Sequence, residues 1–442
     1  MEKGATGAFV LVCDYYDERP KTQTPTLLVG KRRNVQMENW NPVLNKVQEV
    51  SNSVPLEVWK SQNWEKWIAA APFHLQKLFA PIQTTQHGDL VLFRYGKYGD
   101  LFGGEQELEY GEFWDAHNGF YRECRSVVVD IRHMELATAP VKKFLNYGEG
   151  ENSHAYIEHL FYTAKTVEVA DKLDGSMCVA SWHRGKIVVH SSKVLDPHNS
   201  WRLMDMEQLI QQNVDLASGI CMFPHLTFIF EYICAADAHV VNYTKEQEGL
   251  WLIGARNKKN GEELSYAAVE KLAMLLGCKM PMLFQRDLGQ ILEDLRVLPA
   301  DKVEGYVVNF DGHKVKFKTD DYVQLHRILG QLSSPNLVLE YVAENKLDDL
   351  MAKIPETHRP RVREIAHAIV GYAADMSKQV VRYYEIAPQT SRKDFMIWVE
   401  ENVPKEIRGY VREKYLRRAY NVLKKGRGYK KASEVLDLPE EE

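Results

Sequence analysis

The chain has 442 residues, of which 45% are hydrophobic, and a formal net charge of −5. This length suits a globular protein with two or three cores, and the lack of a long uncharged apolar stretch argues against a membrane-spanning helix. The apolar run at 8–13 is too brief for a secretion signal. The six cysteines are scattered without a Cys-x-x-Cys pair, which argues against a zinc site or a disulfide framework. We therefore expect a soluble, cytoplasmic protein, and no protein partner is evident.

The first 85 residues contain no recognisable chemistry. Alternating apolar runs at 8–16 and 25–29, joined by a polar connection, predict a hairpin. Residues 56–79 repeat apolar side chains at helical spacing, which predicts one or two amphipathic helices whose tryptophans belong to the core. We assign residues 1–85 to an N-terminal extension of unknown role.

A strand followed by a basic, aromatic segment comes next. Residues 126–130 read SVVVD and predict a strand. Downstream, Lys142 and Lys143 stand directly before 144–147, which include phenylalanine, leucine and tyrosine. Such a basic pair could hold phosphate while a ring stacks on a base. A solvated strand end explains the same pattern equally well.

The most informative stretch is KLDGS at 172–176, between strand-like runs at 166–170 and 177–182, with a further strand at 187–190. A lysine in a short loop with a flexible Gly-Ser pair behind it is well placed to act as a nucleophile. Because free lysine is protonated near pH 7, that role requires burial or neighbouring positive charge to lower its pKa. An ordinary Asp-Gly turn accounts for the same residues.

A carboxylate interrupts an apolar strand at 226–233. Glu231 lies within LTFIFEYI, where an unpaired charge would be costly. We interpret it either as a salt-bridged core residue or as a ligand contact. The periodic segments that follow the lysine loop predict one more strand, at 250–255, and helices at 201–214, 265–276 and 288–295.

A basic hairpin follows, with strands at 304–310 and 314–318. Strand periodicity places Lys316 and Lys318 on one face, about 7 Å apart. With Glu304 at the start of the partner strand, this pair fits a phosphate clamp beside a metal-binding carboxylate. An exposed basic hairpin is the ordinary alternative.

The last quarter of the chain has helical periodicity, with prolines near the gaps. The predicted helices are 337–351, 360–384, 392–402 and 406–425. Between 405 and 431, eleven lysines or arginines stand against two acidic residues and alternate with tyrosines. This composition suits contact with an RNA backbone and stacking on its bases, although a solvated helix face also fits.

Six segments in this order resemble the motifs of covalent nucleotidyltransferases, the superfamily of polynucleotide ligases and capping enzymes. They are ECRSVVVD (123–130), KFLNYGE (143–149), KLDGS (172–176), FEYICAADAHVVNY (230–243), EGYVV (304–308) and KFKTDDYVQLH (316–326). The sequence most closely resembles the RNA ligase 1 family of T-even bacteriophages, over residues 88 to 330.

The resemblance implies an α+β fold in three parts. After the extension, residues 86–333 would form a nucleotidyltransferase domain, an ATP-grasp-like ligase fold of antiparallel sheets and helices. Residues 334–442 would form an all-helical C-terminal domain, with RNA binding as its expected role. A helical tail fits RNA ligase 1, since DNA ligases and capping enzymes normally have a small β-barrel there.

The family reaction has three steps. Lys172 would attack the α-phosphate of ATP to form lysyl-AMP, the AMP would pass to an RNA 5′-phosphate, and a 3′-hydroxyl would displace it. By the same resemblance Glu231 contacts the ribose and Glu304 is tied to Mg²⁺ or Mn²⁺. Lys316 and Lys318 are expected to lower the pKa of Lys172.

The remaining site residues also follow from the resemblance. The implied nucleotide contacts are Arg125, Lys143, Leu145, Asp174, Gly175, Lys193, Glu231, Glu304, Lys316 and Lys318, with Leu145 where the family often has an aromatic residue. The expected RNA contacts in the tail are Arg408, Arg412, Lys414, Arg417, Arg418, Lys424, Lys425 and Arg427. The sequence departs from the family at Ser126, where glycine is usual, and at Ala238-His239, where Arg-Ile is common.

Other functions remain open from the sequence alone. A DNA ligase or a capping guanylyltransferase would use the same nucleophile, and an inactive RNA-binding protein would keep the fold without the chemistry. The family and the basic tail prompt the hypothesis that the RNA is a broken transfer RNA.

Overall fold

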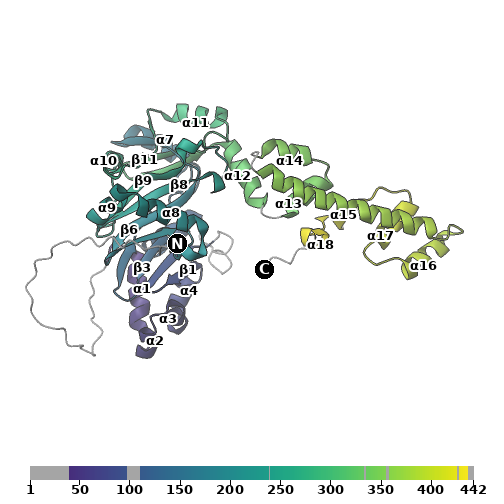
Figure 1. The fold of residues 1–442 in the computed structure, drawn as a ribbon, viewed down its shortest axis with the longest axis horizontal. Coiled ribbons are helices and arrows are strands. Elements are labelled where there is room, and N and C mark those ends of the chain that lie inside the picture. Colours follow the sequence, from purple (N-terminus) through teal and green to yellow (C-terminus); the bar gives the residue numbers. More distant parts are fainter. Residues whose placement is uncertain are drawn as a thin grey trace, which may run out of the picture. The chain divides into compact units, whose positions relative to one another are not determined.

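The computed structural model describes residues 39–96, 110–237, 239–332, 335–354, 358–425 and 428–436. The strands predicted at 8–16 and 25–29 lie outside them. The described chain has the predicted mixed α and β fold, with antiparallel sheets and many helices (Figure 1). None of its helices is long and apolar enough to cross a membrane.

The first sheet has the strand order β1-β2-β3-β4 and packs against short helices. Its elements are α1 (Pro42–Ser53), α2 (Leu56–Lys60), α3 (Trp64–Ala70), α4 (Phe73–Phe79), β1 (Ile82–His87), β2 (Leu90–Tyr95), α6 (Tyr110–Glu123), β3 (Arg125–Asp130) and β4 (Glu135–Thr138). The segment predicted as one or two helices at 56–79 is three, because Asn63 and Pro72 begin new ones. Trp64 and Trp67 are buried in the core, as predicted.

The second sheet has the order β7-β6-β8-β9 and packs one face on three helices. These elements are β6 (Ser176–His183), β7 (Lys186–Ser191), α8 (Trp201–Gln212), α9 (Val214–Met222), β8 (Leu226–Ile233), β9 (Gly249–Asn257) and α10 (Tyr266–Leu276). Apolar side chains of this sheet, such as Phe228 and Phe230, are fully buried against the helices. The predicted strands and the helix at 265–276 are confirmed, whereas the helix predicted at 201–214 ends at Gln212, and Asn213 begins a second helix, α9, that was not predicted.

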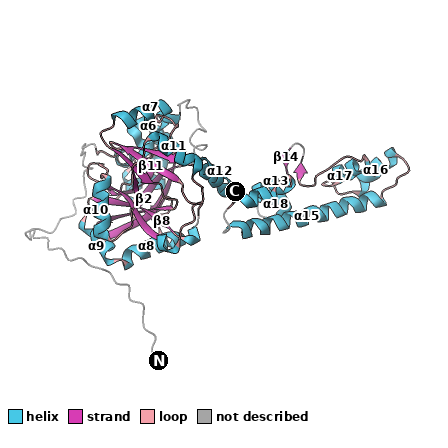
Figure 2. Cartoon of the chain, turned by 90° about the horizontal axis from the view of Figure 1, so that it is seen from above, coloured by secondary structure: helices cyan, strands magenta, loops and turns pink. Residues whose placement is uncertain are grey.

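The third sheet has the order β10-β5-β11-β12. It comprises β5 (Val167–Asp171), β10 (Leu283–Phe284), β11 (Gly305–Phe310) and β12 (His313–Lys318), and it packs with α7 (His154–Thr163) and α11 (Leu288–Val297). The loop 172–175 leads from β5 directly into β6 of the second sheet. The predicted nucleophile therefore lies where the chain passes between two sheets, which are drawn in magenta in Figure 2.

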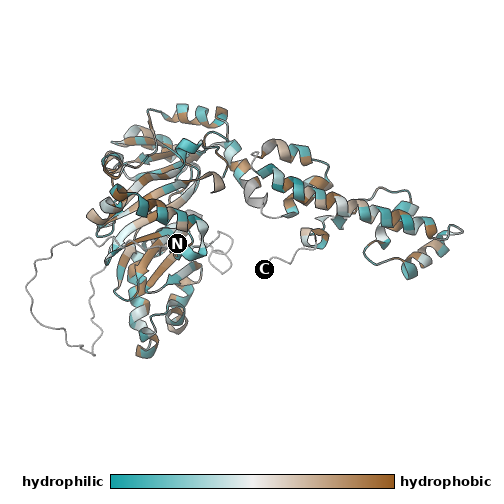
Figure 3. Ribbon diagram, in the orientation of Figure 1, coloured by the Kyte–Doolittle hydropathy of each residue, from teal (hydrophilic) through white to brown (hydrophobic). Residues whose placement is uncertain are grey.

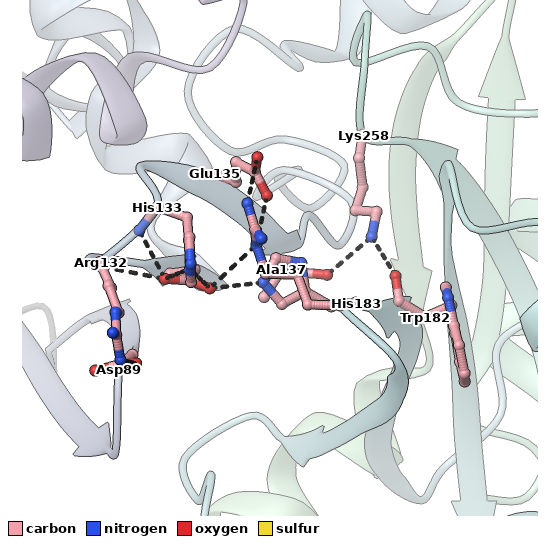
Figure 4. A network of polar contacts seen from close by, with 10 residues as sticks. Asp89, Arg132, His133, Glu135, Ala137, Trp182, His183 and Lys258 are labelled. Atoms are coloured by element: carbon pink, nitrogen blue, oxygen red, sulfur yellow. Dashed lines mark hydrogen bonds and ion pairs between the residues drawn. The ribbon is translucent and has the colours of Figure 1, made fainter. Parts of the chain in front are cut away.

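Buried polar contacts join the first sheet to the second (Figure 4). Asp130, at the end of β3, accepts a hydrogen bond from His183 of β6 at 2.8 Å and contacts His133 at 2.9 Å. The ammonium of Lys258 donates to the carbonyls of Ala137 and Trp182, at 3.2 and 2.8 Å. Burial lowers the pKa of Lys258 to about 8.

The C-terminal region is mostly helical, as predicted. Its elements are α12 (Asp320–Leu332), α13 (Pro335–Ala343), α14 (Leu347–Lys353), α15 (Arg359–Ile386), α16 (Arg392–Asn402), α17 (Arg408–Tyr415), β13 (Lys424–Lys425), β14 (Gly428–Tyr429) and α18 (Ala432–Leu436). The long helix α15 shows alternating brown and teal bands in Figure 3, and it contributes to two separate apolar clusters.

The prediction of a helix at 406–425 is wrong for the second half of that segment. Helix α17 ends at Tyr415, and Arg417 has a left-handed backbone with φ of 52°. The chain then turns into the short β13–β14 hairpin, where the hydroxyl of Tyr410 donates to the carbonyl of Lys424 at 2.8 Å. The C-terminal region is therefore not purely helical. The domain divisions at 85/86 and 333/334 remain predictions.

Candidate active site

The loop that carries Lys172 is held by the carboxylate of Asp174. One oxygen accepts hydrogen bonds from the amides of Val240 and Val241, at 2.8 and 2.9 Å, and the other accepts from the hydroxyl of Tyr322 at 2.7 Å. Asp174 is only 5% exposed. In this structure its carboxylate shapes the loop, whereas the resemblance implied a nucleotide contact.

Two glycines allow the loop and its neighbouring strands to pack closely. A Cβ atom on Gly175 would lie 2.4 Å from the carbonyl oxygen of Tyr232 in β8, so any side chain would displace that strand. Gly305 has φ of 144°, and a Cβ there would lie 1.9 Å from the carbonyl oxygen of Phe317. The carbonyl of Gly305 accepts a hydrogen bond from the amide of Lys172 at 2.9 Å. These approaches fix the position of the lysine relative to β8 and β11.

The side chain of Lys172 is paired with Glu304. The distance from Nζ to Oε1 is 2.8 Å, and Lys318 contacts the same oxygen at 2.9 Å. Burial alone would lower the pKa of Lys172, but the carboxylates of Glu304, Glu231 and Asp174 raise it overall. The predicted lowering of this pKa is therefore wrong for this arrangement, because sequence spacing did not reveal the ion pair.

On strand β12, Lys316 has a depressed pKa. Its Nζ lies 4.8 Å from the centre of the Phe144 ring, and no ion pair to a carboxylate is found for it in the described part of the chain. Burial, followed by the charges of Arg125, Lys143, Lys172 and Lys318, places the pKa of Lys316 well below its usual value. An anion arriving here would relieve this repulsion, which makes the position suited to phosphate.

Glu231 faces the same space from β8. Its Oε1 accepts a hydrogen bond from the amide of Gly175 at 3.0 Å, and no salt bridge to it is found among the described residues. Burial raises the pKa of Glu231 to about 7, against the opposing effect of Lys172. This geometry favours the interpretation of Glu231 as a ligand contact over that of a salt-bridged core residue.

A cavity of about 240 Å³ between the second and third sheets is lined by Lys172 and Glu231 but not by Glu304 or Asp174. We call it the nucleotide cavity. Its charged lining consists of Arg125, Glu168, Asp171, Lys172, Glu231, Lys314, Lys316 and Lys318, and its apolar lining includes Ile229, Ile253, Leu264, Val269 and Val307. An apolar slot with cations at one side suits a flat base carrying phosphates.

Residues 123–322 match the RNA ligase family model of the T4 RNA ligase 1 type. The match spans 200 of the 442 residues. It contains every residue of the nucleotide cavity, from Arg125 to Lys318, so the predicted family resemblance is confirmed for the part of the chain that forms the site.

A protein of Autographa californica nuclear polyhedrosis virus is 24% identical over 260 residues, and its name assigns it to the bifunctional polynucleotide kinase/RNA ligases. The match covers 53% of this chain but 35% of the viral protein, so the chain spans about a third of that relative. A Naegleria gruberi RNA ligase solved with ATP and manganese has a TM-score of 0.33 at 17% identity, covering 39% of this chain and 55% of the other. An archaeal ATP-dependent RNA ligase has a TM-score of 0.42 at 13% identity, covering 85% and 99%.

At the nucleotide cavity, an aromatic residue lies one position before Leu145, where the family often has one. Leu145 is fully buried in the first core, whereas Phe144 lines the cavity. The guanidinium of Arg125 lies 5.0 Å from the centre of the Phe144 ring, and Lys316 lies near the same ring. Because residues 139–145 have no regular secondary structure, no periodicity in the sequence could show which side chain points inward.

Five more predicted contacts do not line the nucleotide cavity, namely Lys143, Asp174, Gly175, Lys193 and Glu304. Lys193 is exposed, and its backbone carbonyl accepts a hydrogen bond from Thr85 while its amide donates one to Ser191. The Nζ of Lys143 lies 4.6 Å from the centre of the Trp114 ring and 5.1 Å from that of Tyr95.

The residues at which the sequence departs from the family pattern make local polar contacts. Ser126 has φ of 68°, a conformation that glycine adopts readily, and its hydroxyl donates to the carbonyl of Ser192 at 2.7 Å. His239 lies beside Asp237, 3.7 Å from Nε2 to Oδ2, and that carboxylate also accepts from Ser176 at 2.6 Å. Ala238 lies outside the described residues.

Most of the basic residues predicted to bind RNA are paired within the C-terminal region. Glu400 contacts both Arg408 and Arg412. Four others have acidic or aromatic partners: Arg418 with Glu413, Lys424 with Glu344, Lys425 with Glu434, and Lys414 with the ring of Tyr384. Arg427 lies outside the described residues. The charge available to a nucleic acid is therefore smaller than the sequence count suggests.

Proposed function

We propose that this protein is an ATP-dependent RNA ligase that joins a 5′-phosphate to a 3′-hydroxyl end through lysyl-AMP. The observation that carries the proposal is the position of Lys172 in a cavity with a row of cations on β12 and an apolar wall opposite. The family match over 123–322 supports it. The RNA substrate, in our proposal, is a broken transfer RNA in the cytoplasm.

Each side chain has a distinct part in the first step. The ammonium of Lys172 first gives up a proton, for which Glu304 at 2.8 Å is the nearest acceptor. The neutral amine then attacks the α-phosphorus, so that an N–P bond forms, the bond to the β-phosphate oxygen breaks with release of pyrophosphate, and a second amine proton passes to solvent. Lys316, Lys318 and Arg125 bind the phosphate oxygens and stabilise the charge that develops there. Glu231 accepts a hydrogen bond from the ribose, and the apolar wall holds the base. In the second step the RNA 5′-phosphate displaces Lys172, and in the third a 3′-hydroxyl displaces AMP.

A divalent metal ion fits this site if ATP supplies most of its ligands. The described residues contain no cluster of three acidic, histidine or cysteine side chains that would hold a metal alone. Glu304 lies beside Lys172 and would provide one carboxylate oxygen, as is usual for Mg²⁺ bound with substrate phosphates. The metal, Mg²⁺ or Mn²⁺, would neutralise phosphate charge when it is bound.

The first experiment is to incubate the protein with ATP labelled at the α-phosphate and look for label on the denatured chain. We expect label on the wild type, none on Lys172→Ala, and wild-type labelling of Lys186→Ala, which changes an exposed lysine on β7. Label from GTP but not ATP would indicate a capping enzyme. No label from either nucleotide, after removal of AMP already attached, would leave an RNA-binding protein.

RNA joining is tested next, with matched RNA and DNA ends. The labelled enzyme should seal 5′-phosphate RNA and not a nick in duplex DNA. Preferential sealing of the DNA nick would contradict the choice of RNA ligase over DNA ligase. Equal sealing of broken transfer RNA and of unstructured oligonucleotides would contradict the proposed substrate.

A further inference from the structure

A second cavity adjoins the nucleotide cavity and shares Phe144 and Lys314 with it. Its volume is about 290 Å³, and its remaining lining includes Arg122, Lys142, Lys143 and Glu151. A more open cavity of about 400 Å³ shares Arg122, Lys142 and Glu151 with it. We call the two together the side cavity.

The side cavity has cations beyond those its carboxylates neutralise. Arg122 contacts Asp115 at 2.7 Å and Glu151 at 2.9 Å, and Lys314 contacts Glu263 at 2.6 Å. Lys142 is exposed and has no ion pair among the described residues. Lys143 beside it packs on aromatic rings. This adjacent pair is available to an anion, and phosphate is the anion that the neighbouring site already handles.

One acceptor in the side cavity needs a donor. Arg122 contacts Oε1 of Glu151, whereas Oε2 is buried and has no hydrogen-bond partner among the described residues; the side chain as a whole is 31% exposed. A buried carboxylate oxygen without a partner is costly. A ligand that presents both a phosphate and a hydroxyl would satisfy Lys142 and Glu151 together, and a ribonucleotide carries both.

The position of the side cavity relates it to the reaction. Lys314, Lys316 and Lys318 lie on the same face of β12 and all line the nucleotide cavity. Four residues of strand separate Lys318 from Lys314, about 13 Å at the usual rise. A row of cations thus runs from Lys318, which shares Glu304 with Lys172, to the side cavity.

We propose that the side cavity binds a ribonucleotide of the RNA strand to be joined, with its phosphate on Lys142 and Lys143 and its 2′-hydroxyl donating to Glu151. This inference rests on the proposed ligase function and specifies how that site takes RNA in preference to DNA, since the 2′-hydroxyl distinguishes the two. The same phosphate chemistry could come from the terminal phosphates of ATP, which the test separates.

The test measures binding of a 5′-phosphorylated single-stranded RNA to the full chain by fluorescence anisotropy at several salt concentrations. Lys142→Glu should weaken binding about tenfold or more and reduce the salt slope by about one. Lys186→Glu is the charge-matched control on β7 and should bind as the wild type does. Equal binding by Lys142→Glu and Lys186→Glu would overturn the proposal.

A second measurement addresses the hydroxyl. The wild type should bind RNA several-fold more tightly than the same strand with 2′-deoxy substitutions near its 5′ end, and Glu151→Ala should lose this preference while melting near the wild-type temperature. If the wild type binds both strands equally, Glu151 does not read the 2′-hydroxyl and the proposal fails.

Measuring lysyl-AMP formation at different ATP concentrations shows whether the side cavity binds ATP or RNA. It also tests the ligase function separately from the role of the side cavity. If Lys142→Glu raises the ATP concentration needed for lysyl-AMP formation and leaves RNA binding intact, the side cavity serves ATP and the proposal is overturned. If the wild type forms no lysyl-AMP, the proposed function fails, whereas the RNA-binding comparison still decides whether the side cavity binds RNA.

Discussion

At the scale of single residues, Lys316 makes the folded protein less stable but serves to bind phosphate. Its half-buried ammonium in the cavity wall lies near four other cations, and replacing a poorly compensated charge by an apolar group of similar length is often stabilising. We expect Lys316→Met to raise the free energy of unfolding by about 1–2 kcal/mol and to abolish lysyl-AMP formation. Urea unfolding and the ATP-labelling assay measure the two effects. A Lys316→Met protein less stable than the wild type would contradict this account of its pKa.

Ser126 offers a second test at this scale, because its left-handed backbone and its hydrogen bond act in opposite directions. Ser126→Ala loses the bond to Ser192 and keeps the strain, so it should lose about 1 kcal/mol of stability. Ser126→Gly loses the bond but relieves a strain of about 1–2 kcal/mol, so it should unfold close to the wild type. Thermal unfolding of the pair gives the order, and a glycine variant less stable than the alanine variant would refute it.

At the scale of elements, the pairing of β11 with β12 depends on Gly305. Its positive φ and the approach of the Phe317 carbonyl leave no room for a methyl group. Gly305→Ala should cost about 3 kcal/mol or more, at the upper end for point mutants. Gly371→Ala is the matched control, since nothing lies within 4 Å of its added Cβ in α15, and helix propensity predicts a gain of about 1 kcal/mol. Similar melting temperatures for the two variants would exclude this role of Gly305.

The contact of β7 with β4 predicts a dependence of stability on pH. His190 is fully buried, its Nε2 lies 2.7 Å from the Thr138 hydroxyl, and burial lowers its pKa to about 4. The unfolded chain, with a histidine pKa of about 6.5, therefore binds this proton first. As the pH falls from about 6.5 to 4, His190 should remove about 3 kcal/mol of stability. Chemical unfolding of the wild type and His190→Gln across this range checks it; an identical slope in both would assign the loss to other groups.

How well each feature could be predicted from the sequence depended on how far apart in the sequence the interacting residues are. The lysine loop and the lysine row on β12 were predictable because a strand, a short turn and a period of two are local properties. The pairing of Lys172 with Glu304 joins residues 132 positions apart, and the inward orientation of Phe144 arises in an irregular segment. Neither feature produces a periodic pattern in the sequence, so each became apparent only in the structure.

At the scale of the whole molecule, charge counting overestimated the RNA-binding surface of the C-terminal region. Lys414 and Arg417 have no ion pair among the described residues, whereas Arg408 and Lys425 are paired with Glu400 and Glu434. If this region binds RNA, the double variant Lys414→Ala/Arg417→Ala should reduce the salt slope of binding by about two. Arg408→Ala/Lys425→Ala should change it less. The opposite order would show that the internal pairs open when RNA binds.

The anchoring of the lysine loop also has a consequence for protein synthesis. Lys172 lies in the first half of the chain, but Glu304, Gly305 and Tyr322, which complete its surroundings, are translated more than 130 residues later. Domains generally begin to fold while they leave the ribosome. A nascent chain in which Lys172 has left the ribosome, but β11, β12 and the start of α12 have not, would lack these contacts. It should therefore not react with ATP until the residues that complete the cavity have been translated.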